Sequence, residues 1–540
     1  MLEINRTKTI LILCIILSIA VLIRIEKMDQ PFGGYHAMNE AWYSATAKNY
    51  SKSSFMNPTV SEYLVDYKVR PVYTYISYLS MRLFGFSEFS PRLVTVMFSV
   101  ISIIFVFLTG RLIRDSFTGI AAAAILAVCP AYVVCGRQAQ PDAAYVSIML
   151  ISIYLFLLSK NSKHEILLKI CAGIIWGISI FTKNFAVMLL PGLIVAEIFY
   201  YRSFGKVFRK LLLFLFIAIL IPMPFIIYHS ITHPGELKEI YSNIAFRIPG
   251  PSVLLYMSKE IIWGLSPLVF IAAVTGIITG LIKRDKYILY IILLGVPFLA
   301  LYFVLHVHSY YILGIIPFAA LTAAVQFRFI KSTRIRISLL TIVLMLAAFN
   351  SVMVLASQKW DQDRFKLLSD DLNEIRKPIV LVIQDELYRN YRSLFFYYVP
   401  DAKIYYCLRG VKLEENDPLA GYYGGFFLTN DKDGYASISP ESKVVMVDFA
   451  NIGSKVSTPF QKIYGNPVNG LCFGRKALIW KPFNRHSFIP EMPDVLEIKG
   501  NSLWGINRVA FSPGIIATEM PEGYRLYHNG ENWEFRRINN

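Results

Sequence analysis

Long apolar runs fill the first two thirds of this sequence, and they constrain its fold more than any other feature. Each run has roughly the 17 to 25 residues that a helix needs to cross about 30 Å of hydrocarbon. The sequence therefore predicts a polytopic α-helical membrane protein of about eleven spans, with thirteen as the upper bound. The runs lie near residues 8–25, 92–110, 117–135, 141–159, 166–182, 185–201, 211–229, 260–282, 287–305, 309–326 and 336–356.

Composition agrees with a membrane protein and excludes an ordinary soluble enzyme, since 55% of the residues are hydrophobic and only 17% are charged. The net charge of +17 lies almost wholly before residue 358, because residues 358–540 hold 23 Lys and Arg against 22 Asp and Glu. The excess of cations falls in alternate loops of the membrane part, as the positive-inside rule requires. The basic charge therefore indicates topology, and we expect no nucleic-acid partner.

The same charge pattern orients the chain. With a cytoplasmic N-terminus, the basic loops lie inside, while loops 27–91 and 230–258 and residues 358–540 lie outside. We expect a multi-pass protein of the plasma membrane whose functional groups face outward.

The first outer loop, residues 27–91, is far longer than a connection requires. Two interfacial helices are predicted in it, over Asn39–Lys52 and Val72–Phe84, with Pro71 opening the second helix and Gly85 ending it. Trp42, Tyr43 and Tyr50 in the first segment favour the level of the lipid headgroups. We therefore predict that this loop forms the reaction chamber.

Three further charged residues lie at outer turns. Arg137 and Asp142 occur in GRQAQPDAA, and Lys183 occurs in FTKNF. Cations at these turns suit an anionic phosphate headgroup. The alternatives are that Asp142 only stabilises a helix N-terminus, that Arg137 and Asp142 form an ion pair, and that Lys183 reaches the interface by snorkelling.

Another outer turn, HVHSYYILG, brings His306 and His308 close to Tyr310 and Tyr311. Two His at i and i+2 could help to bind a divalent metal ion, but no third ligand lies nearby in the sequence. We therefore expect either no cofactor or a divalent metal ion.

Residues 358–540 differ from the membrane part in their sequence pattern. KPIVLVI, AKIYYCL and KVVMVDF are short strand-like runs, and a helical stretch covers Glu386–Tyr398. We predict a membrane domain at 1–357 and an extracytoplasmic soluble α/β domain at 358–540, in which a Cys407–Cys472 disulfide is one option on an oxidising face.

Carboxylates, cations and aromatic residues at headgroup level suit group transfer from a lipid-phosphate donor, because a carboxylate can deprotonate an acceptor hydroxyl while cations hold the leaving phosphate. A transporter or lipid flippase is the main alternative, but such proteins place ionisable groups within their spans. A membrane scaffold with an outer binding domain is the third.

Five segments carry a resemblance to a known family: NEAWYSATAKNY, KVRPVYTYISYLSMRLFGFSEFSPRL, GRQAQPDAA, GISIFTKNFAVMLLP and HSYYILGIIP. In this order, over roughly residues 5–330, they resemble the glycosyltransferase C superfamily, in particular the branch of protein O-mannosyltransferases and the lipid A aminoarabinose transferase. The resemblance implies a polyprenyl- or dolichyl-phosphate-linked sugar as donor, inversion at the anomeric carbon and an active site in the first outer loop.

Residue by residue, the resemblance implies that Glu40 matches the second acid of an Asp-Glu pair, that Arg137 and Asp142 match an Arg and an Asp of the second outer turn, and that Lys183 matches the Lys of a Thr-Lys-Gly motif. The sequence departs from the family at Asn39, where the usual acid is an amide that cannot act as a base.

A second departure replaces the Glu-Lys-Pro-Pro pattern by Asp66, Lys68, Arg70 and Pro71 in altered spacing, so either Glu40 or Asp66 is expected to be the catalytic base. We expect the acceptor to be a lipid, a protein or a glycan, and membrane lipids to be further partners. The expected donor phosphate- and sugar-binding residues are Lys68, Arg70, Arg137, Asp142, Lys183, Tyr310 and Tyr311.

Overall fold

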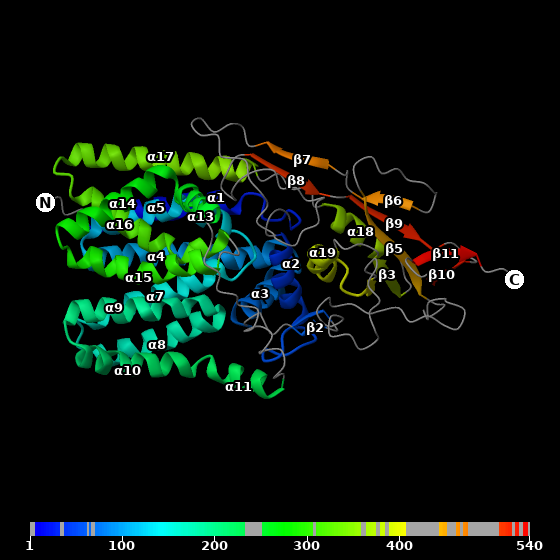
Figure 1. Ribbon diagram of the computed structural model, residues 1–540, viewed down its shortest axis with the longest axis horizontal. Helices are drawn as coiled ribbons and strands as arrows, with labels where there is room; N and C mark the ends of the chain where they lie inside the picture. Colours follow the sequence, from blue (N-terminus) through cyan, green and yellow to red (C-terminus); the bar gives the residue numbers. More distant parts are fainter. Residues whose placement is uncertain are drawn as a thin grey trace.

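The computed structural model shows a bundle of apolar helices at one side and a smaller β-containing part at the other (Figure 1). The N-terminus lies at the far end of the bundle and the C-terminus beyond the sheet. The structure describes residues 6–32, 37–61, 64–65, 71–232, 251–305, 309–357, 363–373, 378–383, 388–406, 442–450, 461–464, 468–473, 507–512, 514–520, 524–528 and 533–537.

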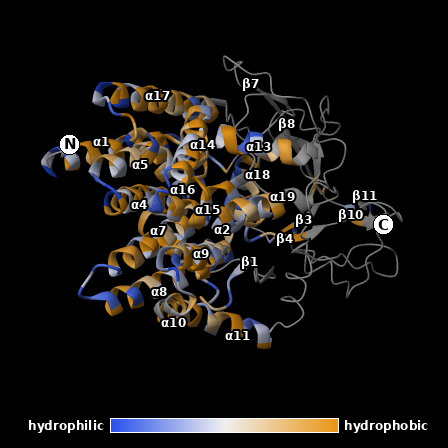
Figure 2. Ribbon diagram, turned by 60° about the vertical axis from the view of Figure 1, so that its left-hand side comes forward, coloured by the Kyte–Doolittle hydropathy of each residue, from blue (hydrophilic) through white to orange (hydrophobic). Residues whose placement is uncertain are grey.

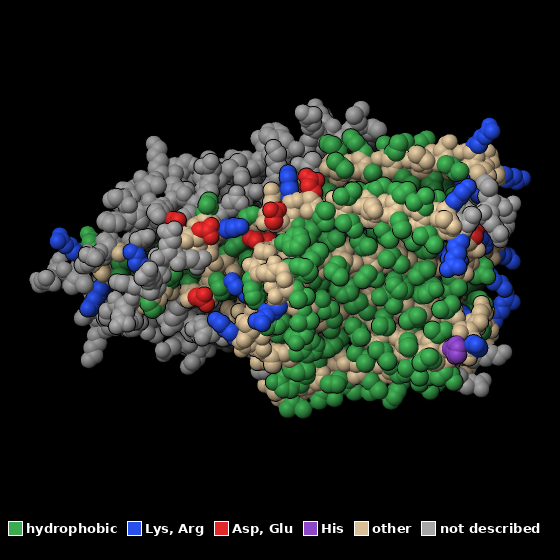
Figure 3. All heavy atoms as spheres, turned by 180° about the vertical axis from the view of Figure 1, so that it is seen from behind, with side chains coloured by type: hydrophobic (Ala, Val, Ile, Leu, Met, Phe, Trp, Pro, Cys, Tyr) green, Lys and Arg blue, Asp and Glu red, His purple; other side chains and the backbone are tan. Residues whose placement is uncertain are grey.

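The helices of the bundle are strongly apolar (Figure 2), and from behind the bundle shows an almost unbroken hydrophobic band with Lys and Arg at its outer edge (Figure 3). The protein is a multi-pass membrane protein. The long helices are α1 (Arg6–Ile25), α4 (Phe89–Ile113), α5 (Ser116–Val128), α7 (Asp142–Ser159), α8 (Glu165–Thr182), α9 (Leu189–Tyr201), α10 (Phe204–Leu220), α14 (Pro267–Ile282), α15 (Lys286–Leu305), α16 (Ile316–Arg328) and α17 (Thr333–Ser357).

We call the end of the bundle that holds Arg6 and the α4–α5, α7–α8 and α16–α17 turns the basic end, and the opposite end the loop end. The other helices of the bundle are α6 (Pro130–Cys135), η1 (Asn184–Met188), α11 (Met223–Thr232), α13 (Pro251–Leu265) and η2 (Ser309–Gly314).

Helices account for all eleven apolar runs, but the predicted count of eleven spans is not confirmed. Among the described residues, seven helices are long and apolar enough to cross a membrane, and nine if each bent pair is one span. Run 117–135 is divided into α5 and α6, and run 309–326 into η2 and the 13-residue α16. Some apolar runs are therefore formed by two helices and not by one continuous helix.

Proline and backbone strain explain where helices break. Proline cannot donate a helix hydrogen bond and clashes with the preceding turn, and Pro130 and Pro267 each begin a new helix. Between α13 and α14 the axis turns by 100°. Ser266 at this corner has a φ of 72°, and its hydroxyl accepts a hydrogen bond from Asn350 at 2.9 Å. The side-chain contact supports a conformation that L-residues rarely adopt.

Two helices in the first loop lie where the sequence predicts them, namely α2 (Ala37–Asn49) and α3 (Pro71–Phe84). Gly85 ends α3 with a φ of 95°, and its N–H donates to the carbonyl of Met81 at 2.9 Å. This is the left-handed C-cap that glycine favours. The strands β1 (Thr59–Ser61) and β2 (Leu64–Val65) form an antiparallel pair between the helices.

The three predicted strand runs of the tail appear as β3 (Ile379–Ile383), β4 (Lys403–Tyr406) and β5 (Lys443–Ala450). They form a five-stranded sheet in the order β4-β3-β5-β9-β6. Strand β3 is parallel to β4 and β5, while β9 is antiparallel to β5 and β6. The remaining bounds are α18 (Asp363–Asn373), α19 (Tyr388–Tyr398), β6 (Gln461–Tyr464), β7 (Val468–Phe473), β8 (Asn507–Ser512), β9 (Gly514–Glu519), β10 (Tyr524–His528) and β11 (Trp533–Arg537).

Helix α19 joins this part to the loop end of the bundle, since it lies against α2 (Figure 1). Buried residues of α2, α18, α19 and β3 share one hydrophobic cluster, which includes Ala41, Phe365, Leu381 and Phe395. The tail and the first loop are therefore packed as one unit.

Candidate active site

Glu40 lies on the small-residue face of α2. Ala37, Ala41, Ser44 and Ala45, which follow the i, i+3 and i+4 spacing of one helix side, are all buried. Glu40 belongs to the same face and is only 1% exposed. Ala37, Ala41 and Ala45 belong to the hydrophobic cluster that α2 shares with α19, so this face of α2, with the Glu40 carboxylate, lies inside the folded protein.

Both oxygens of the Glu40 carboxylate accept hydrogen bonds. Arg92, near the start of α4, donates from Nε to Oε1 at 2.8 Å and from Nη2 to Oε2 at 3.1 Å. The backbone N–H of Ala139 donates to Oε1 at 2.8 Å. This bidentate, charge-assisted geometry is a strong one, and it joins α2, α4 and the turn before α7 at a single buried carboxylate.

Arg92 is a candidate site residue that the sequence analysis did not identify. Its Nη1 also donates to the carbonyl oxygens of Met28 at 3.0 Å and Gln30 at 2.5 Å, and its guanidinium lies 5.0 Å from the Phe32 ring centroid. The chain leaving α1 is thereby attached to the same cation. The signal was an arginine at the first turn of an apolar run, which calls for a buried carboxylate partner.

Arg137 does not pair with Asp142, so the ion pair considered from the sequence is wrong. The Arg137 side chain donates instead to the backbone carbonyl of Glu26. Burial lowers the pKa of Arg137, and the nearby Arg92 cation lowers it further. The residue reinforces the segment that Arg92 also holds.

Asp142 pairs with Lys183. The distance from Lys183 Nζ to Asp142 Oδ1 is 2.6 Å, and the two side chains are only 13% and 1% exposed. Asp142 is the first residue of α7, as predicted, and its Oδ1 accepts a hydrogen bond from the Lys183 ammonium. Its Oδ2 is buried and has no hydrogen-bond partner among the described residues. Helix-end stabilisation alone therefore does not account for Asp142.

Aromatic rings surround the Lys183 ammonium. Its Nζ lies 4.6 Å from the ring centroid of Tyr310, 5.2 Å from Phe185 and 5.3 Å from Tyr311. Burial lowers the pKa of Lys183, whereas the neighbouring Asp142 opposes that shift. Lys183 lies in the turn between α8 and η1 with its ammonium directed at Asp142, and snorkelling to the interface stays an alternative.

One short turn connects the two charged pairs, since Ala139 binds Glu40 and Asp142 follows three residues later. Tyr73 on α3 packs close by, and its hydroxyl lies 2.7 Å from Thr95 Oγ1 on α4. The tyrosine ring contacts Tyr43 of α2 edge to face, with centroids 6.1 Å apart. Helices α2 and α3 thus cover a polar, aromatic site at the loop end.

Comparisons with known proteins agree with this architecture. The family model described as dolichyl-phosphate-mannose-protein mannosyltransferase matches residues 68–228. The crystal structure of ArnT from Cupriavidus metallidurans in the apo state superposes with a TM-score of 0.62 at 13% sequence identity, covering 82% of this chain and 92% of ArnT. This chain has the glycosyltransferase C fold.

A second ArnT structure from the same organism, bound to undecaprenyl phosphate, matches the fold with a TM-score of 0.61 at 14% identity, covering 82% of this chain and 93% of that one. No curated protein matches the sequence. The predicted resemblance to the glycosyltransferase C superfamily is confirmed, and the alternative of a transporter or lipid flippase is not favoured.

Within this glycosyltransferase C fold, Tyr398 at the end of α19 is a further residue that the sequence did not indicate. Its hydroxyl donates to Glu88 Oε1 at 2.9 Å and accepts the N–H of Phe32 at 2.9 Å. Trp42 of α2 contacts Phe396 edge to face at 6.2 Å. The tail thereby helps to fix the loop segment that precedes α2.

Several predicted site residues lie outside the described residues, namely Asp66, Lys68, Arg70, His306, His308 and Cys407. The described part of the chain contains no group of three or more His, Cys, Asp or Glu that could hold a metal ion. The metal site therefore stays a prediction, as do the roles of Asp66, Lys68 and Arg70.

Proposed function

We propose that this protein is an inverting glycosyltransferase, which moves a sugar from a polyprenyl- or dolichyl-phosphate donor to an acceptor hydroxyl at the loop end. The observation that carries the proposal is the pair of buried ion pairs, Glu40–Arg92 and Asp142–Lys183, joined by one turn beneath α2 and α3. Burying charge is costly and needs paired geometry, and perturbed ionisable groups gather at functional sites.

The reaction needs a base and an anion site. A carboxylate removes the proton of the acceptor hydroxyl, the acceptor oxygen attacks the anomeric carbon from the face opposite the phosphate, and the bond from that carbon to the phosphate oxygen breaks. The lipid phosphate leaves as an anion that cations stabilise. Attack from the opposite face inverts the anomeric centre.

Glu40 and Asp66 are the two candidates for the base. In the described structure both Glu40 oxygens accept hydrogen bonds from Arg92 or Ala139. With both oxygens accepting N–H groups, neither is free to accept the proton of an acceptor hydroxyl. In this state Glu40 is suited to position Arg92 and the turn at Ala139. It can act as a base only if Arg92 releases one oxygen of the Glu40 carboxylate.

Lys183 is the candidate for the donor phosphate. A buried ammonium with one carboxylate partner can exchange that carboxylate for a phosphate oxygen with little change in local charge. Tyr310 and Tyr311, which border Lys183, offer flat faces for a sugar. Arg137, Lys68 and Arg70 complete the proposed cationic set.

The proposal includes the orientation that the charges suggest. The basic end faces the cytoplasm of a plasma-membrane protein, and the loop end, together with a C-terminal domain of residues 358–540, faces outward. The acceptor on that face is a lipid, a protein or a glycan.

Transfer by purified protein in liposomes tests the proposal, with polyprenyl-phosphate-linked sugar supplied and free polyprenyl phosphate measured. We expect Asp66→Ala or Glu40→Ala to reduce transfer at least a hundredfold, and the double variant to abolish it. Full transfer by both single variants and the double variant would overturn the proposal. Mass spectrometry of lipids and glycans from a deletion strain identifies the sugar and the acceptor.

A further inference from the structure

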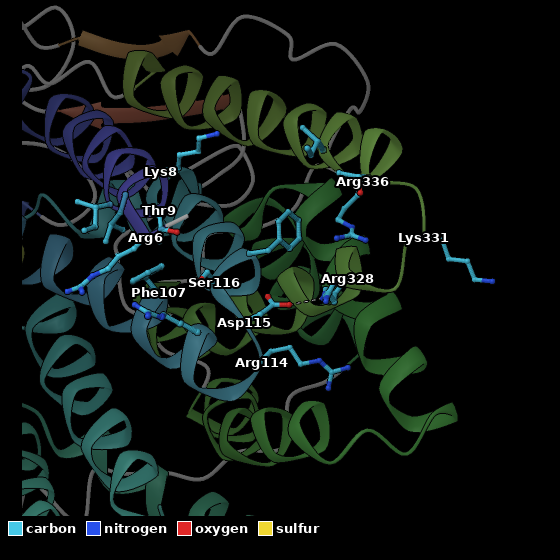
Figure 4. A pocket seen from close by; sticks show the side chains of 16 residues that line it. Arg6, Lys8, Thr9, Phe107, Arg114, Asp115, Ser116, Arg328, Lys331 and Arg336 are labelled. Carbon is cyan, nitrogen blue, oxygen red and sulfur yellow. Dashed lines mark ion pairs between the residues drawn. The ribbon is translucent and has the colours of Figure 1, made fainter. Parts of the chain in front are cut away.

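A cavity opens at the basic end of the bundle, far from Glu40. Its volume is about 1140 Å³, and it lies between the start of α1, the α4–α5 turn and the α16–α17 turn (Figure 4). These segments come from three distant parts of the sequence, residues 6–13, 107–117 and 328–337. The cavity is thus a product of the tertiary fold.

Positive charge dominates the lining. Among the described residues that line the cavity, Asp115 is the only carboxylate. The seven cations of the lining are Arg6, Lys8, Arg111, Arg114, Arg328, Lys331 and Arg336.

The carboxylates of Asp115 and Asp285, which lie near these cations, each already form an ion pair. Asp115 Oδ2 lies 2.7 Å from Arg328 Nε, and its Oδ1 accepts the N–H of Thr118 at 2.8 Å as the N-cap of α5. Arg114 pairs with Asp285 at 2.9 Å. Within the described part of the chain, seven cations against these two carboxylates leave five excess positive charges around one cavity. Figure 4 shows the Asp115–Arg328 pair with labelled cations on several sides of it.

This concentration goes beyond the ordinary excess of cations at the inner ends of membrane helices. Cations that only orient a protein stand apart from one another in water, where screening keeps their repulsion small. Five of the seven lining cations, Arg6, Lys8, Arg111, Arg114 and Lys331, are exposed too. Here the cations of separate helices share the wall of one hollow, where their fields add. A bound anion would remove this repulsion.

The same cavity has an apolar border. Ile10 on α1 and Ile337 on α17 line it, and each is 53% exposed. Both residues belong to helices that are long and apolar enough to span a membrane. A ligand that fits must therefore be anionic at one end and apolar at the other, which favours a lipid over free phosphate.

We propose that this cavity binds the phosphate headgroup of an anionic phospholipid from the leaflet at the basic end. Lys8 and Arg111 meet the phosphate, and the acyl chains run along Ile10 and Ile337. Basic pockets between membrane helices are suited to such headgroups. The lipid would join α1 and α17 to the α4–α5 turn and stabilise the folded bundle by mass action.

Binding by the full chain in a neutral detergent tests the proposal, with native mass spectrometry and thermal unfolding as readouts. The probes are phosphatidylglycerol, phosphatidylcholine and inorganic phosphate. The variant Lys8→Gln/Arg111→Gln removes two lining cations. The matched control Lys163→Gln/Arg334→Gln removes two cations of the same end that do not line the cavity.

We expect phosphatidylglycerol to bind wild type and control alike, at least tenfold more tightly than phosphatidylcholine, and to raise their melting temperatures. The lining variant should lose at least tenfold in affinity for phosphatidylglycerol while melting like wild type without lipid. Equal loss in variant and control would overturn the proposal, because a diffuse surface charge would then suffice. Saturation of the site by inorganic phosphate at a similar concentration would overturn it too, since the site would then serve a soluble anion.

If the double variant melts below wild type without lipid, the affinities of the single variants Arg111→Lys and Arg111→Gln for phosphatidylglycerol test the proposal instead. Arg111→Lys keeps the charge and should keep at least a third of the affinity, whereas Arg111→Gln should lose at least threefold. Equal affinities for these two variants would contradict the proposal.

Discussion

The Glu40 carboxylate receives three N–H groups, two from Arg92 and one from Ala139. Because the pair is buried, removing one partner leaves an uncompensated charge. We expect Glu40→Gln to lower the free energy of unfolding by about 3–5 kcal/mol, and Glu40→Gln/Arg92→Gln to cost less than the sum of its single variants. Thermal unfolding in detergent measures both.

The exposed Lys52–Asp401 pair, 3.6 Å apart, supplies the control, and Asp401→Asn should leave stability unchanged because solvent screens that pair. If Glu40→Gln abolished transfer but melted like wild type, Glu40 would be the base and not a positioning residue.

The Asp142–Lys183 pair predicts a pH dependence. Burial lowers the pKa of Lys183, and Asp142 opposes this shift. We therefore expect Asp142→Asn to lower that pKa further, so that Lys183 loses its proton at a lower pH. If charged Lys183 holds the donor phosphate, the alkaline limb of kcat/KM should move to lower pH in Asp142→Asn. In Lys183→Arg it should move upward, since arginine stays protonated. If the alkaline limb of the kcat/KM profile stayed at the same pH in both variants, Lys183 would not be the residue that holds the donor phosphate.

At the scale of elements, glycines allow α4 and α5 to pack closely. A Cβ added at Gly119 would lie 2.5 Å from the carbonyl oxygen of Phe107, which is backbone and cannot move aside cheaply. We expect Gly119→Ala to lower the melting temperature and the free energy of unfolding by about 1–3 kcal/mol. Gly205 in α10 is the matched control, because no atom lies within 4 Å of its added Cβ. Gly205→Ala should be neutral or slightly stabilising, and equal effects at the two sites would contradict the packing argument.

Helix α19 stabilises the first loop through the Tyr398 hydroxyl, which bonds both Glu88 and the Phe32 N–H. We expect Tyr398→Phe to cost about 1–3 kcal/mol, because it leaves buried polar groups unsatisfied. Hydrogen exchange should become faster at the Phe32 amide and in α2, and stay unchanged in α17.

Tyr397→Phe is the matched change, since the described residues give its hydroxyl no hydrogen-bond partner, and it should leave exchange unaltered. If both variants behaved alike, packing of the rings and not the hydroxyl would hold α19 in place.

For the whole molecule, the sequence predicted what depends on local pattern. The apolar runs predicted the helices, Pro71 and Gly85 predicted the two ends of α3, and the β-rich runs predicted β3, β4 and β5. It did not predict which charges meet. Glu40 and Arg92 are 52 residues apart, and Asp142 and Lys183 are 41 apart. Such partners are set by tertiary packing. The break at Ser266, which divides run 260–282, is marked locally by Pro267, although its 100° angle is not. The burial of Glu40, which is 1% exposed, was not predicted either.

The orientation of the molecule is its last testable property, and it follows from charge alone. If the positive-inside rule holds here, the basic end is cytoplasmic and α19 lies outside. Single cysteines test this at two exposed positions in intact cells, Asp401→Cys beside α19 and Lys163→Cys in the α7–α8 turn. A membrane-impermeant maleimide should label position 401 and leave position 163 unlabelled until the cells are opened. Labelling of 163 alone would invert the topology, and the proposed active site would then face the cytoplasm.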